Sequence, residues 1–484
     1  MKRKLMGMTE ASWLMLETKN RPMHVASLLV YSLPKGAPKN YLRDLVSELR
    51  ETTEFADPFN RKLFYSELMP FVTAIPFWGE DHDLDLEYHV RHLSLPEPGG
   101  ERELGILISR LHSNPMDLSR PLWEYHVIEG LENNRFAVYF RMHHSIVDGM
   151  SSIEMMQRSM STDPKEVSTP AIWSAAGAPI QSLSLREAAK QVSNSFKTLV
   201  PVTKKLLKVA ESSLDGDDAF TQPFQAPKTI LNGRLKSQRR FATQQYDFER
   251  IKALSKLGDC TINDIVLALC SGALRDFLRE LQALPSKSLT AGIPISLRTE
   301  NDSASPAVSF IVASLATNIA DPLRRLEAIK ASTRRAKEML QDMSKPEIES
   351  FNNILAAPQF LQTALNLEGR TRPVYNVIIS NVPGPRMPLY FRGSKLEAMY
   401  PVSAVTHGQA LNITCYSYAG TLTFGFAGCR DTLPRMQRLA VKTGKALNEL
   451  EAALKANSPQ SKEDAKALAE KKPIKRKARA KPKR

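Results

Sequence analysis

Residues 135–149 read RFAVYFRMHHSIVDG, a strand-like segment that ends in two adjacent histidines. Large apolar side chains stand at every second position from Phe136 to Met142, and this period of two predicts a β-strand with two distinct faces. If the extended conformation continues to His144, that ring shares a face with Phe136 and Met142, whereas His143 lies on the opposite face. The two histidines are therefore not expected to act as one ligand set.

The residues after the histidines predict a turn that leads into a helix. Apolar side chains at helical spacing between Met150 and Met160 predict a helix with one apolar face. Gly149 permits a backbone geometry that other residues would block, and Asp148 lies close enough in sequence to orient a ring or stabilise the turn. A neutral imidazole, with an unperturbed pKa of about 6.5, accepts a proton at cellular pH. A histidine at this turn is therefore suited to act as a general base.

Strands and helices alternate in both halves of the chain, which favours an α/β architecture. An N-terminal half (residues 1–160) and a C-terminal half (residues 237–455) are expected, followed by a basic disordered tail (residues 456–484). The region between the halves, residues 161–236, is rich in Ser, Lys, Ala, Pro and Gln and predicts a crossover linker with one helix over Leu185–Val209. In the C-terminal half the expected strands are Ala291–Leu297, Phe310–Thr317, Tyr375–Ser380, Ala410–Ser417 and Thr421–Phe426. The expected helices there are Tyr246–Leu257, a helix capped by Thr261 that runs to about Leu284, and Leu323–Met343.

The composition is that of a globular protein with a basic tail. The chain has 484 residues, of which 42% are hydrophobic and 24% charged. The formal net charge is +15, but nine Lys or Arg residues lie within residues 471–484, which leaves +6 for the rest of the chain. Such a tail either solubilises the protein or adheres to an anionic lipid surface. Nucleic acid is not an expected partner, because the sequence has no zinc finger, recognition helix or aromatic–basic pattern.

The sequence also argues against membrane-spanning, secreted and metal-binding proteins. No apolar run approaches the roughly 18 residues that cross a bilayer, and the N-terminus lacks the apolar core of a secretory signal. The cysteines show no CxxC spacing, so reduced thiols in a cytosolic protein are expected, and no metal site. The cysteines are Cys260, Cys270, Cys415 and Cys429.

Several short motifs resemble one family of acyltransferases. His143–Gly149 matches HHxxxDG, which is found in acyltransferases related to chloramphenicol acetyltransferase and in peptide-synthetase condensation domains. Pro121–Trp123 matches PLW, Asn263–Asp264 matches ND and Ser380–Pro385 matches SNVPGP, three motifs of the bacterial wax ester synthase/acyl-CoA:diacylglycerol acyltransferase family. Pro22–Val25 also resembles that family. Because order and spacing agree, the chain resembles this family over all but its linker and tail.

The resemblance implies an α/β fold of two chloramphenicol-acetyltransferase-like halves, each a mixed sheet with helices. The active site would lie in a tunnel at their interface, with acyl-CoA entering from one mouth and the acceptor from the other. The implied substrates are long-chain acyl-CoA and a fatty alcohol or, less well, diacylglycerol. No cofactor is implied, because acyl-CoA is itself a substrate. Substrates this apolar favour a cytoplasmic enzyme that associates peripherally with the inner face of the membrane or with lipid inclusions.

The resemblance also assigns roles around the histidines. His144 would be the general base that takes the proton from the acceptor hydroxyl, and His143 would support it. Asp148 is usually structural in this superfamily, and Arg298, which follows the strand Ala291–Leu297, is its expected ion-pair partner. Gly149 completes the turn. No covalent acyl-enzyme is expected, because the sequence has no GxSxG nucleophile motif.

The ND motif and a separate histidine each have a structural interpretation. Asp264 can complete a capping box with Thr261 at the start of a helix. Asn263 could still reach the site and hydrogen-bond the acceptor oxygen or the developing oxyanion. His407 lies in a loop of small residues without a motif partner and is expected to be structural.

Two interpretations also remain open for the PLW and SNVPGP motifs. Trp123 is either a core residue or a wall of the acyl channel. Asn381, Pro383 and Gly384 belong to a rigid bend after a strand. That bend is either a structural loop at the seam of the halves or a shaping element of the active-site tunnel.

Two other functions compete with the lipid acyltransferase. One is a condensation- or acetyltransferase-like enzyme with a polar acceptor, which the PLW and SNVPGP matches disfavour. The other is a non-catalytic basic lipid-binding protein, which the intact HHxxxDG motif disfavours.

Overall fold

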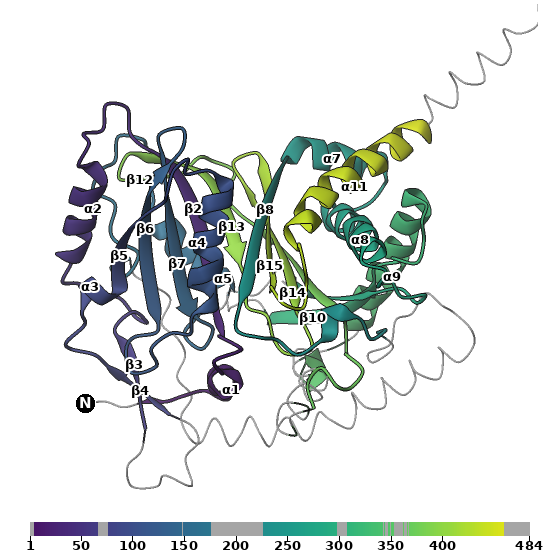
Figure 1. Ribbon diagram of the computed structural model, residues 1–484, viewed down its shortest axis with the longest axis horizontal. Coiled ribbons are helices and arrows are strands. Elements are labelled where there is room, and N and C mark those ends of the chain that lie inside the picture. Colours follow the sequence, from purple (N-terminus) through teal and green to yellow (C-terminus); the bar gives the residue numbers. More distant parts are fainter. Residues whose placement is uncertain are drawn as a thin grey trace, which may run out of the picture.

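In the computed structural model the chain forms two neighbouring β-sheets with helices (Figure 1). It describes residues 4–65, 76–147, 149–175, 226–297, 307–341 and 367–458, together with positions 343, 347, 348, 350–352, 362 and 365. Outside the described residues lie Asp148, Arg298, the expected helix Leu185–Val209 and the tail from residue 459 onward.

The first sheet is built around the strand that the histidine motif predicted. This strand, β7 (Arg135–His143), pairs antiparallel with β2 (His24–Ser32) on one side and β6 (Trp123–Leu131) on the other. The two predicted faces are confirmed: Phe136 and Met142 belong to one apolar core, whereas Tyr139 packs in another on the opposite side. The full order is β12 (Tyr390–Phe391), β13 (Ser394–Val402), β2, β7, β6 and β5 (Val90–Ser94).

The second sheet is mixed, as expected for this fold. Its strand β11 (Val377–Pro383) runs parallel to both β9 (Thr290–Leu297) and β14 (Leu411–Tyr418). All the other pairings in this sheet are antiparallel. The full order is β10 (Ala307–Ser314), β9, β11, β14, β15 (Thr421–Cys429) and β8 (Arg239–Asp247).

Two expected helix boundaries were wrong. The helix capped by Thr261 ends at Glu280 and not near Leu284. The expected helix Tyr246–Leu257 begins only at Phe248, because Tyr246 and Asp247 end the edge strand β8. Asp247 caps the helix α7 (Phe248–Leu257): its carboxylate accepts a hydrogen bond from the Arg250 backbone N–H at 2.7 Å. A capping aspartate between a strand and a helix therefore sets this boundary.

The helices flank the two sheets. In Figure 1, α7, α8 (Ile262–Glu280), α9 (Pro322–Gln341) and α11 (Gln437–Ala456) cover the side of the second sheet that faces away from the first. The remaining helices are α1 (Met8–Leu16), α2 (Tyr41–Arg50), α3 (Leu86–His89), α4 (Glu101–Ser113) and α5 (Gly149–Arg158), with a 3-10 turn at Ile230–Asn232. A small sheet joins β1 (Lys4–Leu5), β4 (Phe77–Glu80) and β3 (Arg61–Phe64).

The two halves are not built from two separate stretches of the chain. Strands β12 and β13 follow β11 in sequence, yet they extend the first sheet. At the ends of the expected linker, Trp173 is fully buried in the first core, and Leu231 and Leu235 belong to the core of the second sheet. Each half therefore contains segments from both sides of the linker.

Hydrogen bonds and close packing join the two sheets. The Thr423 hydroxyl of β15 donates to the Met399 carbonyl of β13 at 2.6 Å. Gly425 has no side chain here because a Cβ atom would overlap the carbonyl of Pro401. On the other side, the Ser109 hydroxyl of α4 accepts the Phe241 backbone N–H of β8 at 3.0 Å. These contacts fix the seam against which the histidine motif lies.

Within the described ranges, no single helix has the length and apolar character needed to cross a membrane. Among the described helices, only α7 and α8 taken together have the required length and apolar character, and these two helices meet at a bend of 99°.

Candidate active site

Two neighbouring motifs fix the end of β7. The backbone N–H of His143 donates to the Leu122 carbonyl of the PLW segment at 2.9 Å. The backbone N–H of His144 donates to the Met23 carbonyl of the PMHV segment at 2.8 Å. The strand then ends, because the Ile146 N–H turns back to the His143 carbonyl at 3.1 Å. His143 is thus the last residue of β7 and His144 the first residue of the turn, so the extended conformation stops one residue short of His144.

His143 is buried, and its Nδ1 is hydrogen-bonded. The backbone N–H of Ser145 donates to its Nδ1 at 3.1 Å, and the Ser145 hydroxyl lies 2.7 Å from the same atom. Because a backbone N–H only donates, Nδ1 must be an acceptor, so the ring proton belongs on Nε2. Nε2 lies at an ion-pair distance of 3.4 Å from Oε2 of Glu17 and forms no hydrogen bond. The ring is thus held in one tautomer.

His144 has different surroundings. It is half-buried, and its imidazole stacks on the indole of Trp13 from α1 with 4.0 Å between ring centroids and 9° between planes. Glu17, which faces His143, comes from the end of the same helix. Sequence reasoning missed both Trp13 of α1 and Glu17, the C-cap residue of that helix. Their spacing of four, which places them on one face of a helix, was the available signal.

Buried polar groups surround the same end of the first sheet. His24 pairs with His143 in the sheet register, and burial lowers its pKa well below 6.5. Burial also lowers the pKa of His112 to about 3; its ring lies 2.9 Å from the Tyr139 hydroxyl. Glu124 remains ionised: burial opposes its charge, but His126 and Arg141 outweigh burial and hold the pKa of Glu124 at about 2.

Trp123 is a core residue in this structure. It is fully buried, and its indole N–H donates to the Phe59 carbonyl at 2.8 Å. Its ring stacks on His89 and on Trp173, with centroid separations of 4.4 and 5.2 Å. The PLW motif therefore reaches the histidine turn through the Leu122 carbonyl.

The predicted capping box is present at the start of α8. One carboxylate oxygen of Asp264 accepts the Thr261 backbone N–H at 3.0 Å, and the other accepts the Thr333 hydroxyl of α9 at 2.9 Å. Asn263 is half-buried in the first turn of α8. Asp264 thus both caps α8 and ties it to α9.

The SNVPGP segment comes close to the helix that follows the histidines. Asn381 and Pro383 lie in β11, which extends further than expected, with Asn381 opposite Cys415 of β14. A Cβ atom on Gly384 would overlap the Tyr416 ring and the Ser417 carbonyl. The Tyr416 hydroxyl in turn accepts a hydrogen bond from the Gln157 amide of α5 at 3.5 Å. Gly384 thus permits β14 and α5 to meet at the seam.

The remaining predicted residues are placed only in part. Gly149 is the first residue of α5, and the Asp148–Arg298 pair lies outside the described residues. His407 accepts the Leu235 backbone N–H at Nδ1, 2.9 Å away, and burial lowers its pKa to about 4. These contacts agree with its expected structural role.

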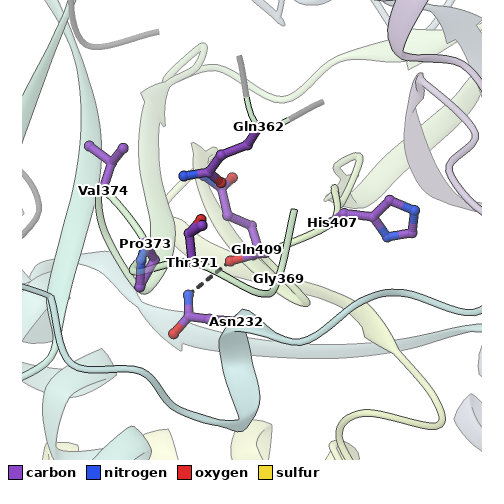
Figure 2. A pocket seen from close by; sticks show the side chains of 9 residues that line it. Asn232, Gln362, Gly369, Thr371, Pro373, Val374, His407 and Gln409 are labelled. Atoms are coloured by element: carbon purple, nitrogen blue, oxygen red, sulfur yellow. Dashed lines mark hydrogen bonds between the residues drawn. The ribbon is translucent and has the colours of Figure 1, made fainter. Parts of the chain in front are cut away.

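A polar hollow lies beside His407 (Figure 2). Its empty volume of ≈ 290 Å³ includes open solvent, and amide and hydroxyl side chains point into it, with the Asn232 amide donating to the Gly408 carbonyl at 2.8 Å. A hollow this polar is unsuited to an alkyl chain. Its lining residues are Asn232, Gln362, Gly369, Thr371, Pro373, Val374, His407, Gly408 and Gln409.

Comparison with known proteins places this arrangement in a family. Residues 6–266 match the wax ester synthase/diacylglycerol acyltransferase catalytic domain, and residues 306–451 match the C-terminal domain of the same family. A putative diacylglycerol O-acyltransferase of Mycobacterium tuberculosis H37Rv is 42% identical, with 93% of this chain and 97% of the relative covered. The O-acyltransferase WSD of Acinetobacter baylyi is 39% identical, with 88% and 92% covered.

Solved structures agree. The wax ester synthase/diacylglycerol acyltransferase of Marinobacter aquaeolei VT8 is 37% identical with a TM-score of 0.76, over 93% of this chain and 99% of that one. A condensation domain of the calcium-dependent antibiotic synthetase shares the fold at 16% identity, with a TM-score of 0.58 over 94% and 97% of the two chains.

The fold and the HHxxxDG turn thus define an acyl-CoA-dependent O-acyltransferase of the two-sheet class, as the sequence predicted. Within that class, the chain belongs to the wax ester synthase/diacylglycerol acyltransferase family.

Proposed function

We propose that the protein transfers a long-chain fatty acyl group from acyl-CoA to a long-chain fatty alcohol and, less well, to diacylglycerol, with His144 as the general base. The observation that carries the proposal is the contrast between the adjacent histidines. The His143 ring is committed to Ser145 and Glu17, whereas His144 occupies the turn beyond the strand. The names of the relatives, wax ester synthase and diacylglycerol O-acyltransferase, support the two acceptors.

In the proposed reaction, a neutral His144 accepts the proton of the acceptor hydroxyl as its oxygen attacks the thioester carbonyl. The new C–O bond forms and the C–S bond breaks, which gives the ester and the CoA thiolate. The imidazolium then returns the proton to the thiolate. Neither a covalent acyl-enzyme nor a cofactor takes part.

The proposed role of His143 is to hold the turn. Its backbone N–H is bonded to the PLW segment, and its ring is bonded to Ser145 and faces Glu17. These contacts keep the peptide that leads into His144 at a fixed position. Such preorganisation of a catalytic group accelerates a reaction without any contact between His143 and substrate.

We further propose that the enzyme works at the cytoplasmic face of a membrane or at a lipid inclusion. The alcohol, the diacylglycerol and both ester products are insoluble in water. The nine basic residues of the C-terminal tail would attract an anionic surface by about 1 kcal/mol each.

The acceptor is tested with purified protein, palmitoyl-CoA and detergent-dispersed lipid. Free thiol release and ester products are measured with hexadecanol, with diacylglycerol and without acceptor. The proposal expects thiol release that depends on the acceptor and is faster with hexadecanol. Release without acceptor would identify a thioesterase instead. Release only with a polar alcohol or amine would identify the acetyltransferase-like alternative.

A further inference from the structure

Helix α1 and its C-cap residue Glu17 contact both motif histidines. Trp13 and Glu17 are four residues apart, which places them one helical turn from each other. The Trp13 indole stacks on His144 at 4.0 Å, and the Glu17 carboxylate lies 3.4 Å from Nε2 of His143. Helix α1 and its C-cap therefore contact the two adjacent imidazole rings in different ways: one ring is stacked, and the other lies at an ion-pair distance from a carboxylate.

The helix that carries Trp13 is anchored at both ends. At its start, the Glu10 carboxylate accepts the Gly7 backbone N–H at 3.0 Å and the Trp78 indole N–H at 3.0 Å. At its end, the Arg21 guanidinium donates to the Leu16 carbonyl. Trp13 is thus presented to His144 by a fixed scaffold.

We propose that Trp13 is a positioning residue for acyl transfer, whose indole holds the plane of the His144 imidazole. This inference rests on the proposed role of His144 as the base. Planes only 9° apart block rotation of the imidazole about its Cβ–Cγ bond. The nitrogen lone pair and the N–H of an imidazole point outward in the ring plane, so stacking on the ring face does not cover them. Once the ring takes a proton, the indole face also attracts the resulting cation.

The test compares side chains at position 13 that stack with side chains that only fill space. Trp13→Phe keeps an aromatic face, whereas Trp13→Leu and Trp13→Met keep apolar volume without one. The inference expects kcat to fall at least ~10-fold in the Leu and Met variants, equal to about 1.4 kcal/mol of barrier, with KM for both substrates unchanged. Phe should restore most of the lost rate. Met15→Ala is the matched control, because Met15 is 54% exposed on the same helix.

A second measurement does not depend on activity. In an NMR spectrum of the protein with labelled histidine rings, the indole should shift the His144 Hε1 signal upfield. His144→Gln identifies the signal, and Trp13→Leu or Trp13→Met should move it downfield.

The outcomes separate the inference from the proposed function. Wild-type kcat in Trp13→Leu or Trp13→Met, with an unchanged His144 signal, would overturn the positioning role alone. Equal losses in the Phe, Leu and Met variants would also overturn it, because volume and not stacking would then matter. Full activity in His144→Ala would instead refute the proposed function.

Discussion

At the scale of single residues, His143 and His144 are neighbours with unlike tasks. The His143 ring is buried between Ser145 and Glu17, so it stabilises the fold of the turn. The His144 ring is half-buried and stacked on Trp13, so it is oriented without being enclosed. Substitutions should therefore separate stability from catalysis at adjacent positions.

His143→Ala should lower the free energy of unfolding by about 1–3 kcal/mol, because it leaves buried polar partners unsatisfied. His144→Ala, at the half-buried position, should lower it by less than about 1 kcal/mol. Urea denaturation of both variants measures the difference. Equal destabilisation would contradict the division of roles.

Gly384→Ala should destabilise the protein by about 1–3 kcal/mol, because its Cβ would overlap the Tyr416 ring and the Ser417 carbonyl. The matched control is Gly105→Ala in α4, where the Cβ would meet only the Phe241 carbonyl at an ordinary 3.8 Å. Alanine there should be neutral or stabilise by up to about 1 kcal/mol. The melting temperature should therefore fall for Gly384→Ala and stay constant or rise for Gly105→Ala; an unchanged value for Gly384→Ala would refute the close packing.

At the scale of elements, local sequence patterns predicted most of the strands and helices that they describe. The alternation from Phe136 to Met142 predicted β7 and its two faces, because successive side chains of a strand point to opposite sides, and each side of β7 packs in a different core. The pattern failed at residues 239–247, since the edge strand β8 is largely polar and its Asp247 begins a helix directly.

Local sequence patterns did not show which distant segments meet. The pairing of β13 with β2 and the stacking of Trp13 on His144 join residues more than a hundred positions apart. The motif resemblance indicated which segments matter, but it did not predict their contacts. Trp123 and Asp264 illustrate this: both belong to family motifs, and the structure gives each a packing or capping contact.

Asp264→Ala should reduce stability by about 1–3 kcal/mol, because α8 loses the Asp264 half of its capping box and its hydrogen bond to Thr333 of α9. Turnover per folded molecule should persist. Asp247→Ala, which removes the cap of α7, is the matched control and should cost about 1 kcal/mol. If turnover collapses in Asp264→Ala while the unfolding midpoint stays constant, the ND motif acts in catalysis instead.

At the scale of the whole molecule, the two sheets draw strands from both parts of the chain and meet at a buried polar seam. The His112 ring belongs to this seam: its Nε2 lies 3.1 Å from the Ser403 carbonyl beyond β13. A buried neutral histidine links folding to pH, because the unfolded chain binds the proton that the folded chain excludes. The free energy of unfolding therefore falls as the pH is lowered, even over a pH range in which no carboxylate changes its charge.

Burial lowers the pKa of His112 from 6.5 to about 3, so its contribution is complete above pH 6.5 and is lost as pH falls from 6.5 towards 3. Near pH 4.5 the slope of unfolding free energy against pH should include about 1.4 kcal/mol per pH unit from this ring. His112→Gln should reduce that slope. His82→Gln, at an exposed position, should not; identical slopes for all three proteins would refute the linkage.

Deletion of residues 471–484 removes nine positive charges and should weaken binding to anionic vesicles but not to neutral ones. The difference should shrink at high ionic strength, because salt screens exposed charges. Sedimentation with vesicles measures binding, and turnover on detergent-dispersed hexadecanol serves as the control and should be unchanged. Equal vesicle binding by the full and shortened chains would show that the tail does not anchor the enzyme.

The most direct test of the account is the rate of acceptor-dependent thiol release from palmitoyl-CoA by His144→Ala, beside the parent protein and with hexadecanol as acceptor. A missing general base should lower kcat by roughly 10²–10⁴-fold, with an unfolding midpoint close to that of the parent. Parent-like turnover in a folded His144→Ala protein would contradict the account and return the search for the base to His143.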